Sequence, residues 1–293
     1  MRPKIWIVFL LMSISLAGLA QQETGTAEKI NLPASDRIKT FTLSPEGTKI
    51  VFTSLIDNKT KVYNLKKHAL VDLPAGIQPN SVVFSKDEKW AFSLSNEKLI
   101  VFDLHNAETK TIGKDEFESL KRWLWWYHIW NKDKAELLEM NWKALAAGTA
   151  QLPAVELNNG KIVLTGKDSK EIDPLDNRYY LSPTLSPDKT KICGVAYGKG
   201  TFVCRLNEEL IYGPSKLESP SWVDNEFIVA TRTDDDGHEV LSSEIILVNI
   251  QTGKSESIVL NDLKAMSPKF SKAENKIYFQ TPEGELYSVK IKK

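Results

Sequence analysis

The decapeptide LSPEGTKIVF at residues 43–52 decides the fold, because variants of it recur along the chain. They are FSKDEKWAF at 84–92, LSPDKTKICGV at 185–195, FSKAENKIYF at 270–279 and a shortened copy, WVDNEFIVA, at 222–230. Each consists of a hydrophobic residue, a polar turn and an alternating apolar run. Proline presets φ in such turns, and acidic residues and glycine satisfy or permit the tight backbone. The phrase therefore predicts two strands joined by a short turn.

A second phrase follows each copy and predicts a third strand, with a turn and a short fourth strand after most copies. It reads VYNL at 62–65, VFDL at 101–104, VCRL at 203–206, LVNI at 247–250 and LYSV at 286–289. One unit is thus four antiparallel strands in about 40 residues, a repeat length typical of propeller blades. The hydrophobic residues that open the units are Leu43, Phe84, Trp130, Leu185, Trp222 and Phe270. We expect an all-β fold, a six-bladed β-propeller.

The predicted domain is a single propeller over residues 28–293. Its blades are expected near 38–73, 80–113, 122–165, 180–213, 218–260 and 265–291. The last unit ends after three strands, and an unpaired edge is a liability for a sheet. Residues 28–32 contain the pattern KINL, which matches the fourth-strand pattern ALVDL. We therefore expect this N-terminal strand to complete the last blade and to close the ring.

The third unit has two open interpretations. PAVELNNGKIVLT at 153–165 matches a third strand, an Asn-Gly turn and a fourth strand, and Trp130 would open the first half of the unit. The alternative is an inserted helical hairpin, because Asp115 and Glu118 resemble a capping box and an apolar stripe follows at helical spacing. We favour strands, because the repeat frame is satisfied on both sides.

Residues 1–20 have the order of a secretory signal peptide: a basic start at Arg2 and Lys4, an apolar run, and small residues before an expected cut between Ala20 and Gln21. An uncleaved anchor is the alternative, but the apolar stretch ends after about 15 residues, short of the roughly 20 that span a bilayer. We expect cleavage, a short linker at 21–27, no membrane span in the mature chain, and export to the periplasm or beyond the cell.

The composition is that of an ordinary globular protein, with 42% hydrophobic and 26% charged residues. Lys and Arg together number 38, as do Asp and Glu, so the formal net charge is zero. That balance gives no support for a nucleic-acid partner, which calls for basic surfaces. The motifs G-x-S-x-G, H-E-x-x-H, C-x-x-C and G-x-x-x-x-G-K are absent. We therefore expect a non-catalytic protein, a monomer without a cofactor.

Cys193 and Cys204 are the two cysteines of the chain and flank a glycine-rich turn in a predicted hairpin. A two-residue turn would pair Tyr197 with Gly200 and place the cysteines directly opposite each other, within disulfide reach. In an oxidising compartment such a pair indicates a disulfide. Two buried free thiols are the alternative.

The repeat resembles that of TolB-like β-propellers, on LSPEGTKIVF, LSPDKTKI, FSKDEKWAF and VFDL followed by TKTI, over residues 28–293. TolB itself is periplasmic and has an extra α/β domain before its propeller, for which the short linker leaves no room. The resemblance therefore implies the propeller alone, a binding or scaffold module of the cell envelope with a protein, peptide or glycan partner. Related six-bladed propellers include metal-dependent lactonases, so a metal-dependent hydrolase or lactonase with its site in the central channel is the alternative.

An aromatic segment interrupts the repeat. Trp123, Trp125, Trp126, Tyr127 and His128 lie within six residues of one another, and five of the eight tryptophans fall between positions 123 and 142. Exposed aromatic residues at this density suit a sugar or a protein partner. Buried ones would fill the wedges between blades, which is the interpretation that we favour for at least one face of the segment.

A charged loop in the fifth unit is the other candidate binding site. Asp234, Asp235, Asp236, His238 and Glu239 place five ligating side chains in one extended hairpin. Ca²⁺ or another divalent cation takes several oxygen ligands from such a flexible turn. The spacing is not that of an EF-hand, however, and Asp-Gly is ordinary turn chemistry. A solvated loop is the preferred interpretation, and a polar or metal site the alternative.

Overall fold

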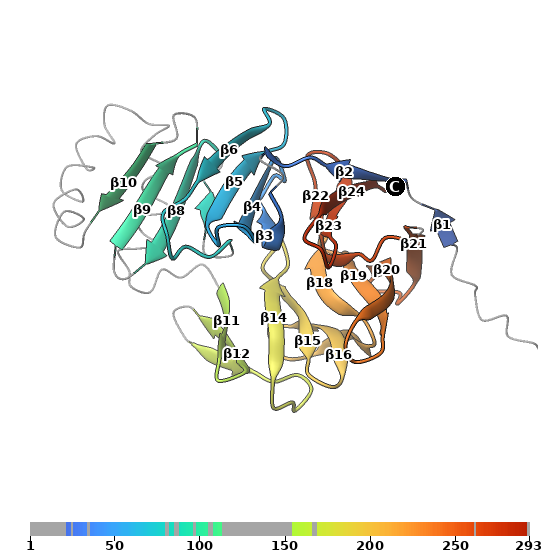
Figure 1. Ribbon diagram of the computed structural model, residues 1–293. Helices are drawn as coiled ribbons and strands as arrows, with labels where there is room; N and C mark the ends of the chain where they lie inside the picture. The colour runs from blue at the N-terminus through green and yellow to red at the C-terminus, as the bar shows by residue number, and fades with distance from the viewer. Residues whose placement is uncertain are drawn as a thin grey trace, which may run out of the picture.

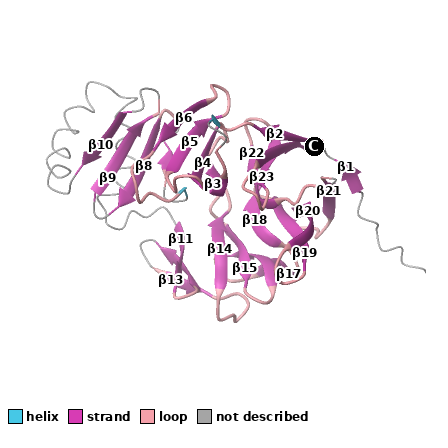
Figure 2. Cartoon of the chain, in the orientation of Figure 1, coloured by secondary structure: helices cyan, strands magenta, loops and turns pink. Residues whose placement is uncertain are grey.

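The structure is a computed structural model, and it describes residues 22–24, 26–33, 36–79, 82–84, 88–95, 98–104, 108–112, 154–165, 169–260 and 262–291. The regular secondary structure of these residues is almost entirely β-strand, arranged in six sheets. The sheets succeed one another in chain order along a curved path that brings the C-terminal sheet back beside the first (Figures 1 and 2). Within the described ranges, no helix has the length and apolar character to cross a membrane.

The first two sheets have four antiparallel strands each, as the repeat predicts. The first sheet consists of β3 (Ile38–Leu43), β4 (Lys49–Ser54), β5 (Thr60–Asn64) and β6 (Ala69–Asp72). The second consists of β7 (Val83–Phe84), β8 (Trp90–Ser95), β9 (Lys98–Asp103) and β10 (Glu108–Ile112).

The fourth, fifth and sixth sheets repeat this order. The fourth sheet consists of β14 (Tyr180–Leu185), β15 (Lys191–Ala196), β16 (Gly200–Arg205) and β17 (Leu210–Ser215). The fifth consists of β18 (Glu218–Trp222), β19 (Phe227–Asp235), β20 (Val240–Asn249) and β21 (Ser255–Val259). The sixth starts with β22 (Met266–Ser271), β23 (Lys276–Gln280) and β24 (Leu286–Lys290).

The third sheet differs from its prediction. It has three described strands, β11 (Ala154–Asn158), β12 (Lys161–Thr165) and β13 (Lys170–Ile172), in that spatial order. The predicted end at residue 165 is therefore too early, and β12 is not the last strand. The hairpin around Asn159 and Gly160 corresponds to the second and third strands of a four-stranded unit, since β13 follows it as the outer one. The helical or strand character of 113–153 lies outside the described residues.

Two N-terminal strands join sheets formed by the other end of the chain. β2 (Ala27–Ile30) pairs antiparallel with β24, at the position expected for residues 28–32. β1 (Gln22–Thr24) pairs parallel with β21 in the fifth sheet. The segment 21–27, predicted to be a linker, therefore contains one short strand and the first residue of another.

The hydrophobic core lies between the sheets rather than at a single centre. Five apolar clusters join the first sheet to the second, the third to the fourth, the fourth to the fifth, the fifth to the sixth, and the sixth to the first. Four of the second strands are largely buried: all six residues of β4, most of β15 and β23, and the centre of β19. This explains why the run after the turn is nearly continuous in apolar residues rather than alternating as predicted, because a strand covered on both sides needs apolar residues at almost every position.

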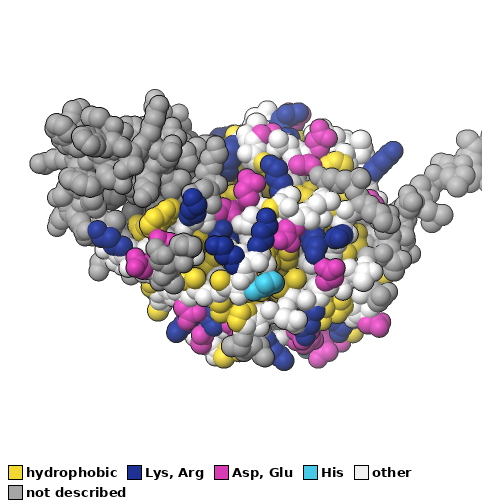
Figure 3. All heavy atoms as spheres, turned by 90° about the horizontal axis from the view of Figure 1, so that it is seen from above, with side chains coloured by type: hydrophobic (Ala, Val, Ile, Leu, Met, Phe, Trp, Pro, Cys, Tyr) yellow, Lys and Arg dark blue, Asp and Glu magenta, His cyan; other side chains and the backbone are white. Residues whose placement is uncertain are grey.

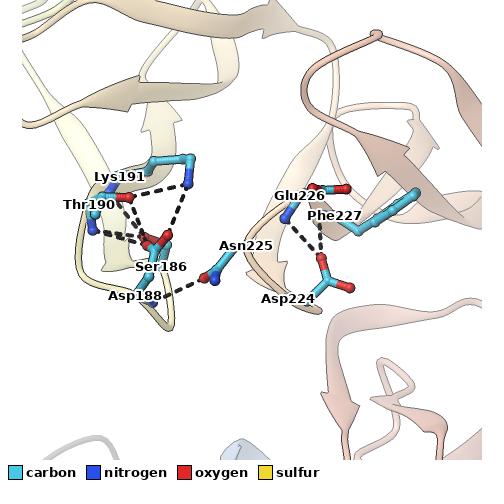
Figure 4. A network of polar contacts seen from close by, with 8 residues as sticks. All are labelled: Ser186, Asp188, Thr190, Lys191, Asp224, Asn225, Glu226 and Phe227. Carbon is cyan, nitrogen blue, oxygen red and sulfur yellow. Dashed lines mark hydrogen bonds and ion pairs between the residues drawn. The ribbon is translucent and has the colours of Figure 1, made fainter.

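The repeated turn phrase joins neighbouring sheets through hydrogen bonds. In the fourth sheet, the Asp188 carboxylate accepts hydrogen bonds from Ser186 (2.6 Å), Thr190 (2.8 Å) and Lys191 (3.3 Å). The Asp188 N–H donates to the side-chain oxygen of Asn225 in the next sheet (3.0 Å), as Figure 4 shows. The turn is thereby folded by its own side chains and attached to its neighbour.

The turn between β3 and β4 is held from both sides. The Ser271 hydroxyl of the sixth sheet donates a hydrogen bond to the carbonyl of Gly47 (2.9 Å). The Ala273 N–H donates one to the carbonyl of Glu46 (3.0 Å). From the second sheet, the buried carboxylate of Glu88 accepts the Glu46 N–H (2.8 Å) and lies 3.3 Å from the Lys49 ammonium. These contacts connect three successive sheets through one turn.

Candidate functional site

The first strands of four sheets converge on one cavity, which we call the inner-strand cavity. It has a volume of about 750 Å³. Its described lining is rich in hydroxyl groups from β3, β14, β18 and β22, namely Thr40, Thr42, Ser182, Thr184, Ser219 and Ser267. Lys189 and Lys269 also line it, and no Asp, Glu or His belongs to this described lining. The chemistry of these walls is that of hydrogen bonding and positive charge.

A repeated Ser-Pro pair shapes the walls of the inner-strand cavity. Ser182, Ser219 and Ser267 each precede a proline, and their φ angles of 48°, 50° and 51° are in the left-handed region. At each pair the register against the second strand shifts, which marks a β-bulge. Proline is tolerated here because the first strand is an edge strand that faces the cavity. The bulge makes the same three sheets present their hydroxyl groups in the same way.

Lys269 is the residue in the cavity wall with the most unusual environment. It lies on β22 and is partly buried, and neither a carboxylate nor a hydrogen-bond acceptor contacts its ammonium within the described chain. Burial lowers the pKa of the Lys269 ammonium, and the nearby Cys193 opposes this effect weakly. An unpaired cation in a hydroxyl-lined wall can attract an anionic group.

The sequence interpretation missed this site. Its residues come one or two at a time from units that lie about 40 residues apart, and none forms a cluster along the chain. The Ser-Pro pair that comes two positions before Thr184, Ser221 and Lys269 was the signal available in the sequence.

The charged loop is a turn at the end of the β19–β20 hairpin, folded by its own aspartates. The Asp235 carboxylate accepts the Gly237 N–H (2.9 Å), and the Asp236 carboxylate accepts the N–H groups of His238 (2.9 Å) and Glu239 (2.8 Å). These backbone hydrogen bonds lower the pKa of Asp236. Asp234 is opposite Ser242 in the ladder. The aspartates thus fold the turn, as ordinary Asp-Gly chemistry would.

His238 and Glu239 reach a second cavity, of about 520 Å³, at the junction of the fifth, sixth and first sheets. Gln280 lines it too, and its amide donates to the carbonyl of Lys39 (3.4 Å) while its buried side-chain oxygen has no partner in the described structure. The structure therefore separates the five predicted ligands, because two face this cavity and the three aspartates do not line it. Among the described residues, no group of three or more His, Cys, Asp and Glu side chains is arranged to hold a metal ion.

The predicted register of the cysteine hairpin is wrong. The turn has three residues, so Ala196 pairs with Gly200, and Cys193 is opposite Val203 rather than Cys204. A shift of one residue reverses the face on which a side chain lies. Cys193 consequently packs between the fourth and fifth sheets, and Cys204 between the third and fourth. Both are buried free thiols, which was the alternative interpretation.

The aromatic candidates Trp123, Trp125, Trp126, Tyr127 and His128 lie outside the described residues.

On the face seen in Figure 3, basic and acidic side chains are interspersed among hydrophobic ones over the described surface. This mixed pattern agrees with the zero net charge of the sequence.

No protein-family model matches the chain, and no curated protein matches it. Solved structures do. An oligogalacturonate lyase from Vibrio parahaemolyticus superposes with a TM-score of 0.53 at 11% sequence identity, covering 92% of this chain and 98% of that one.

Two further solved structures have lower TM-scores. The Swd1 β-propeller domain from Myceliophteria thermophila has a TM-score of 0.44 at 8% identity, covering 91% and 100% of the two chains. The C-terminal WD40 domain of Sif2 has a TM-score of 0.40 at 12% identity, covering 89% and 83%. At these identities a likeness shows the fold alone. Together with the succession of four-stranded antiparallel sheets, the likeness to the first of these structures confirms the predicted all-β fold, and the chain is a β-propeller.

Proposed function

We propose that this chain is an exported, non-catalytic binding propeller of the bacterial cell envelope, of the TolB-like type, and that it takes its ligand in the inner-strand cavity. One observation carries this proposal. Four sheets contribute hydroxyl groups to a single cavity of about 750 Å³, which is within the usual size range of ligand sites.

The character of the wall supports binding rather than catalysis. General acid–base chemistry most often uses histidines, carboxylates or lysines, and the described lining offers hydroxyl groups and two lysines but neither a carboxylate nor a histidine. Each Ser or Thr hydroxyl can both donate and accept a hydrogen bond. Because strands rather than loops hold these groups, they are positioned by the scaffold before a ligand arrives.

Export is supported by the signal-peptide order of residues 1–20. N-terminal sequencing of the protein recovered from the periplasm is expected to begin at Gln21. Recovery of the uncleaved chain in the membrane fraction would contradict this part of the proposal.

Affinity capture from envelope extract tests the binding site. Thr40 is exposed on β3 and lines the cavity, so Thr40→Trp should obstruct it without disturbing the core. Thr111→Trp, on the outer strand β10, is the matched control because Thr111 is exposed and lies away from the cavity lining. We expect Thr40→Trp to lose ligands or partners that both the wild type and Thr111→Trp retain. Identical capture by all three proteins would place binding elsewhere.

A further inference from the structure

Lys269 occupies a repeat position at which three other units have Thr or Ser. The residue just before the opening hydrophobic residue is Thr42 in the first unit, Thr184 in the fourth and Ser221 in the fifth, but Lys269 in the sixth. At this repeat position, the inner-strand cavity therefore has a positive charge from the sixth sheet, where the first and fourth sheets contribute the hydroxyl groups of Thr42 and Thr184.

Within the described part of the chain, no carboxylate pairs with the Lys269 ammonium. The buried lysines of the described structure, Lys49, Lys61 and Lys191, each have a carboxylate within reach, at 3.3 Å (Glu88), 2.7 Å (Asp36) and 3.3 Å (Asp188). Lys269 has no such carboxylate among the described residues, although it too is withdrawn from water. Burying a charge without a partner is costly, so a scaffold that only had to fold would be better served by Thr or Ser at this position.

The groups around Lys269 suit a ligand that carries both an anionic group and hydroxyl groups. Thr42, Thr184 and Ser267 line the same cavity and can donate to or accept from the hydroxyl groups of a ligand. Pro183 and Pro220 add apolar surface to the same lining. Hydroxyl and apolar groups in a cavity that also contains lysine ammonium groups suit a sugar ring that bears a carboxylate.

We propose that the inner-strand cavity binds a carboxylated sugar, a uronate, whose carboxylate pairs with Lys269. This inference rests on the proposed function and names its ligand class. The ring hydroxyls of the sugar would be met by the Ser and Thr side chains of the neighbouring sheets.

Calorimetric titration with digalacturonate and with its dimethyl ester tests the charge requirement, because the two sugars differ mainly in the carboxylate charge. Hydrogen bonds to charged groups are worth more than neutral ones, so we expect the wild-type protein to bind the ester at least tenfold more weakly. Lys269→Met should weaken digalacturonate binding at least tenfold, whereas Lys269→Arg, which keeps the charge, should retain most of it.

The matched control is Lys254→Met, which removes the same charge from an exposed turn between β20 and β21 and should bind like the wild type. Lys269→Met removes a charge without a described partner, so its fold is expected to survive, and its melting curve verifies this. Equal affinity for acid and ester, equal affinity of wild type and Lys269→Met, or no binding of either sugar would overturn the inference. Preference for a peptide with a free C-terminal carboxylate over digalacturonate would overturn it as well.

Failure of this inference is distinguishable from failure of the proposed function. If Thr40→Trp and Lys269→Met both lose partners from envelope extract while digalacturonate does not bind, the cavity is the site and the ligand class is wrong. If neither variant changes capture, the proposed function itself is wrong.

Discussion

Ser44, Ser186 and Ser271 occupy the same position of the repeated turn phrase, and all three are buried. The hydroxyl oxygens of Ser44 and Ser186 accept the N–H groups of Lys49 and Lys191, each at 3.0 Å, and that of Ser271 accepts an N–H group at 3.3 Å. A buried backbone donor needs a partner, and serine supplies it from within the turn. This is the physical reason why the phrase recurs and why it could be recognised in the sequence.

Gly47 belongs to the same turn and has a φ of 74°. A Cβ atom at Gly47 would lie 2.7 Å from the Cα of Ser271, so Gly47→Ala must push the sixth sheet away from the first. Gly253→Ala is the matched control, since Gly253 has a φ of 69° and open space around it. We expect Gly47→Ala to cost roughly 2 kcal/mol more than Gly253→Ala in urea denaturation, because overpacking adds to backbone strain. Equal costs would show that the close approach is absent.

The charged Lys269 side chain should lower the free energy of unfolding of the ligand-free protein, because its charge is withdrawn from water without a described partner. Its pKa is lowered in the folded state, so the unfolded chain holds the proton more tightly, and stability rises with pH between the lowered pKa and the ordinary value of 10.5. Lys269→Met should therefore melt several degrees higher than the wild type at pH 7. In a chain of this size, each kcal/mol of unfolding free energy corresponds to a shift of roughly 2–4 °C in the melting temperature. The difference should shrink as the pH approaches 10. Calorimetry at both pH values measures this, and a lower melting temperature at pH 7 would mean that Lys269 has a stabilising partner.

At the scale of elements, Glu88 shows how one side chain ties two sheets together. Glu88 is 4% exposed. Its carboxylate accepts hydrogen bonds from the Glu46 N–H and the Thr48 hydroxyl and lies beside the Lys49 ammonium. Burial alone would raise the pKa of Glu88, but the hydrogen bonds from Thr48 and Glu46 outweigh it, so the pKa is lowered. The charged form is therefore the one that the folded state prefers.

Glu88→Gln should destabilise the protein at pH 7 by roughly 1.5–3 kcal/mol, the range for hydrogen bonds to charged groups. Because the lowered pKa contributes stability above the ordinary value of 4.5 and loses it as the pH falls through the folded value, the wild type should lose this advantage in acid. Urea denaturation at pH 7 and below pH 4 measures both. A difference between the two proteins that is unchanged in acid would contradict the role of the charge.

The N-terminal strand β2 is the element that brings the two chain ends together. It pairs with β24 from Ala27 to Ile30, and Ile30 also packs against the cluster between the sixth and first sheets. A mature chain that starts at Pro33 should melt lower by roughly 5 °C or more, since about 2 kcal/mol of pairing and burial is lost. A chain that starts at Thr26 is the control, because it removes β1 and keeps β2. If both truncated chains melt together with the full mature chain, β2 does not hold the last sheet.

The strands were predicted better than their exact pairing register, because a shift of one residue leaves a strand in place but moves each side chain to its opposite face. The turn phrases anchor each strand pair with several residues, so an error of one position leaves the element recognisable. The hairpin between β15 and β16 depended on turn length alone, and a three-residue turn instead of a two-residue one moved Cys193 and Cys204 to opposite faces. A turn phrase that recurs in several units therefore predicts strand positions more reliably than the assumed length of one turn predicts a register.

At the scale of the whole molecule, the fold follows from the repeat because each sheet buries its faces against the next one. Five apolar clusters between consecutive sheets show this arrangement in the described chain. The inner-strand cavity could not be predicted in the same way, since Thr42, Thr184 and Lys269 come together only when separate units are arranged around it. Its recognition needs the three-dimensional arrangement.

A crystal structure of the mature protein with digalacturonate would show directly whether the inner-strand cavity binds a uronate. The sugar is expected in the inner-strand cavity, with one carboxylate within hydrogen-bond distance of the Lys269 ammonium and ring hydroxyls against Thr184 or Ser267. An empty cavity at saturating sugar, or a Lys269 ammonium already paired with a carboxylate of its own chain, would contradict it.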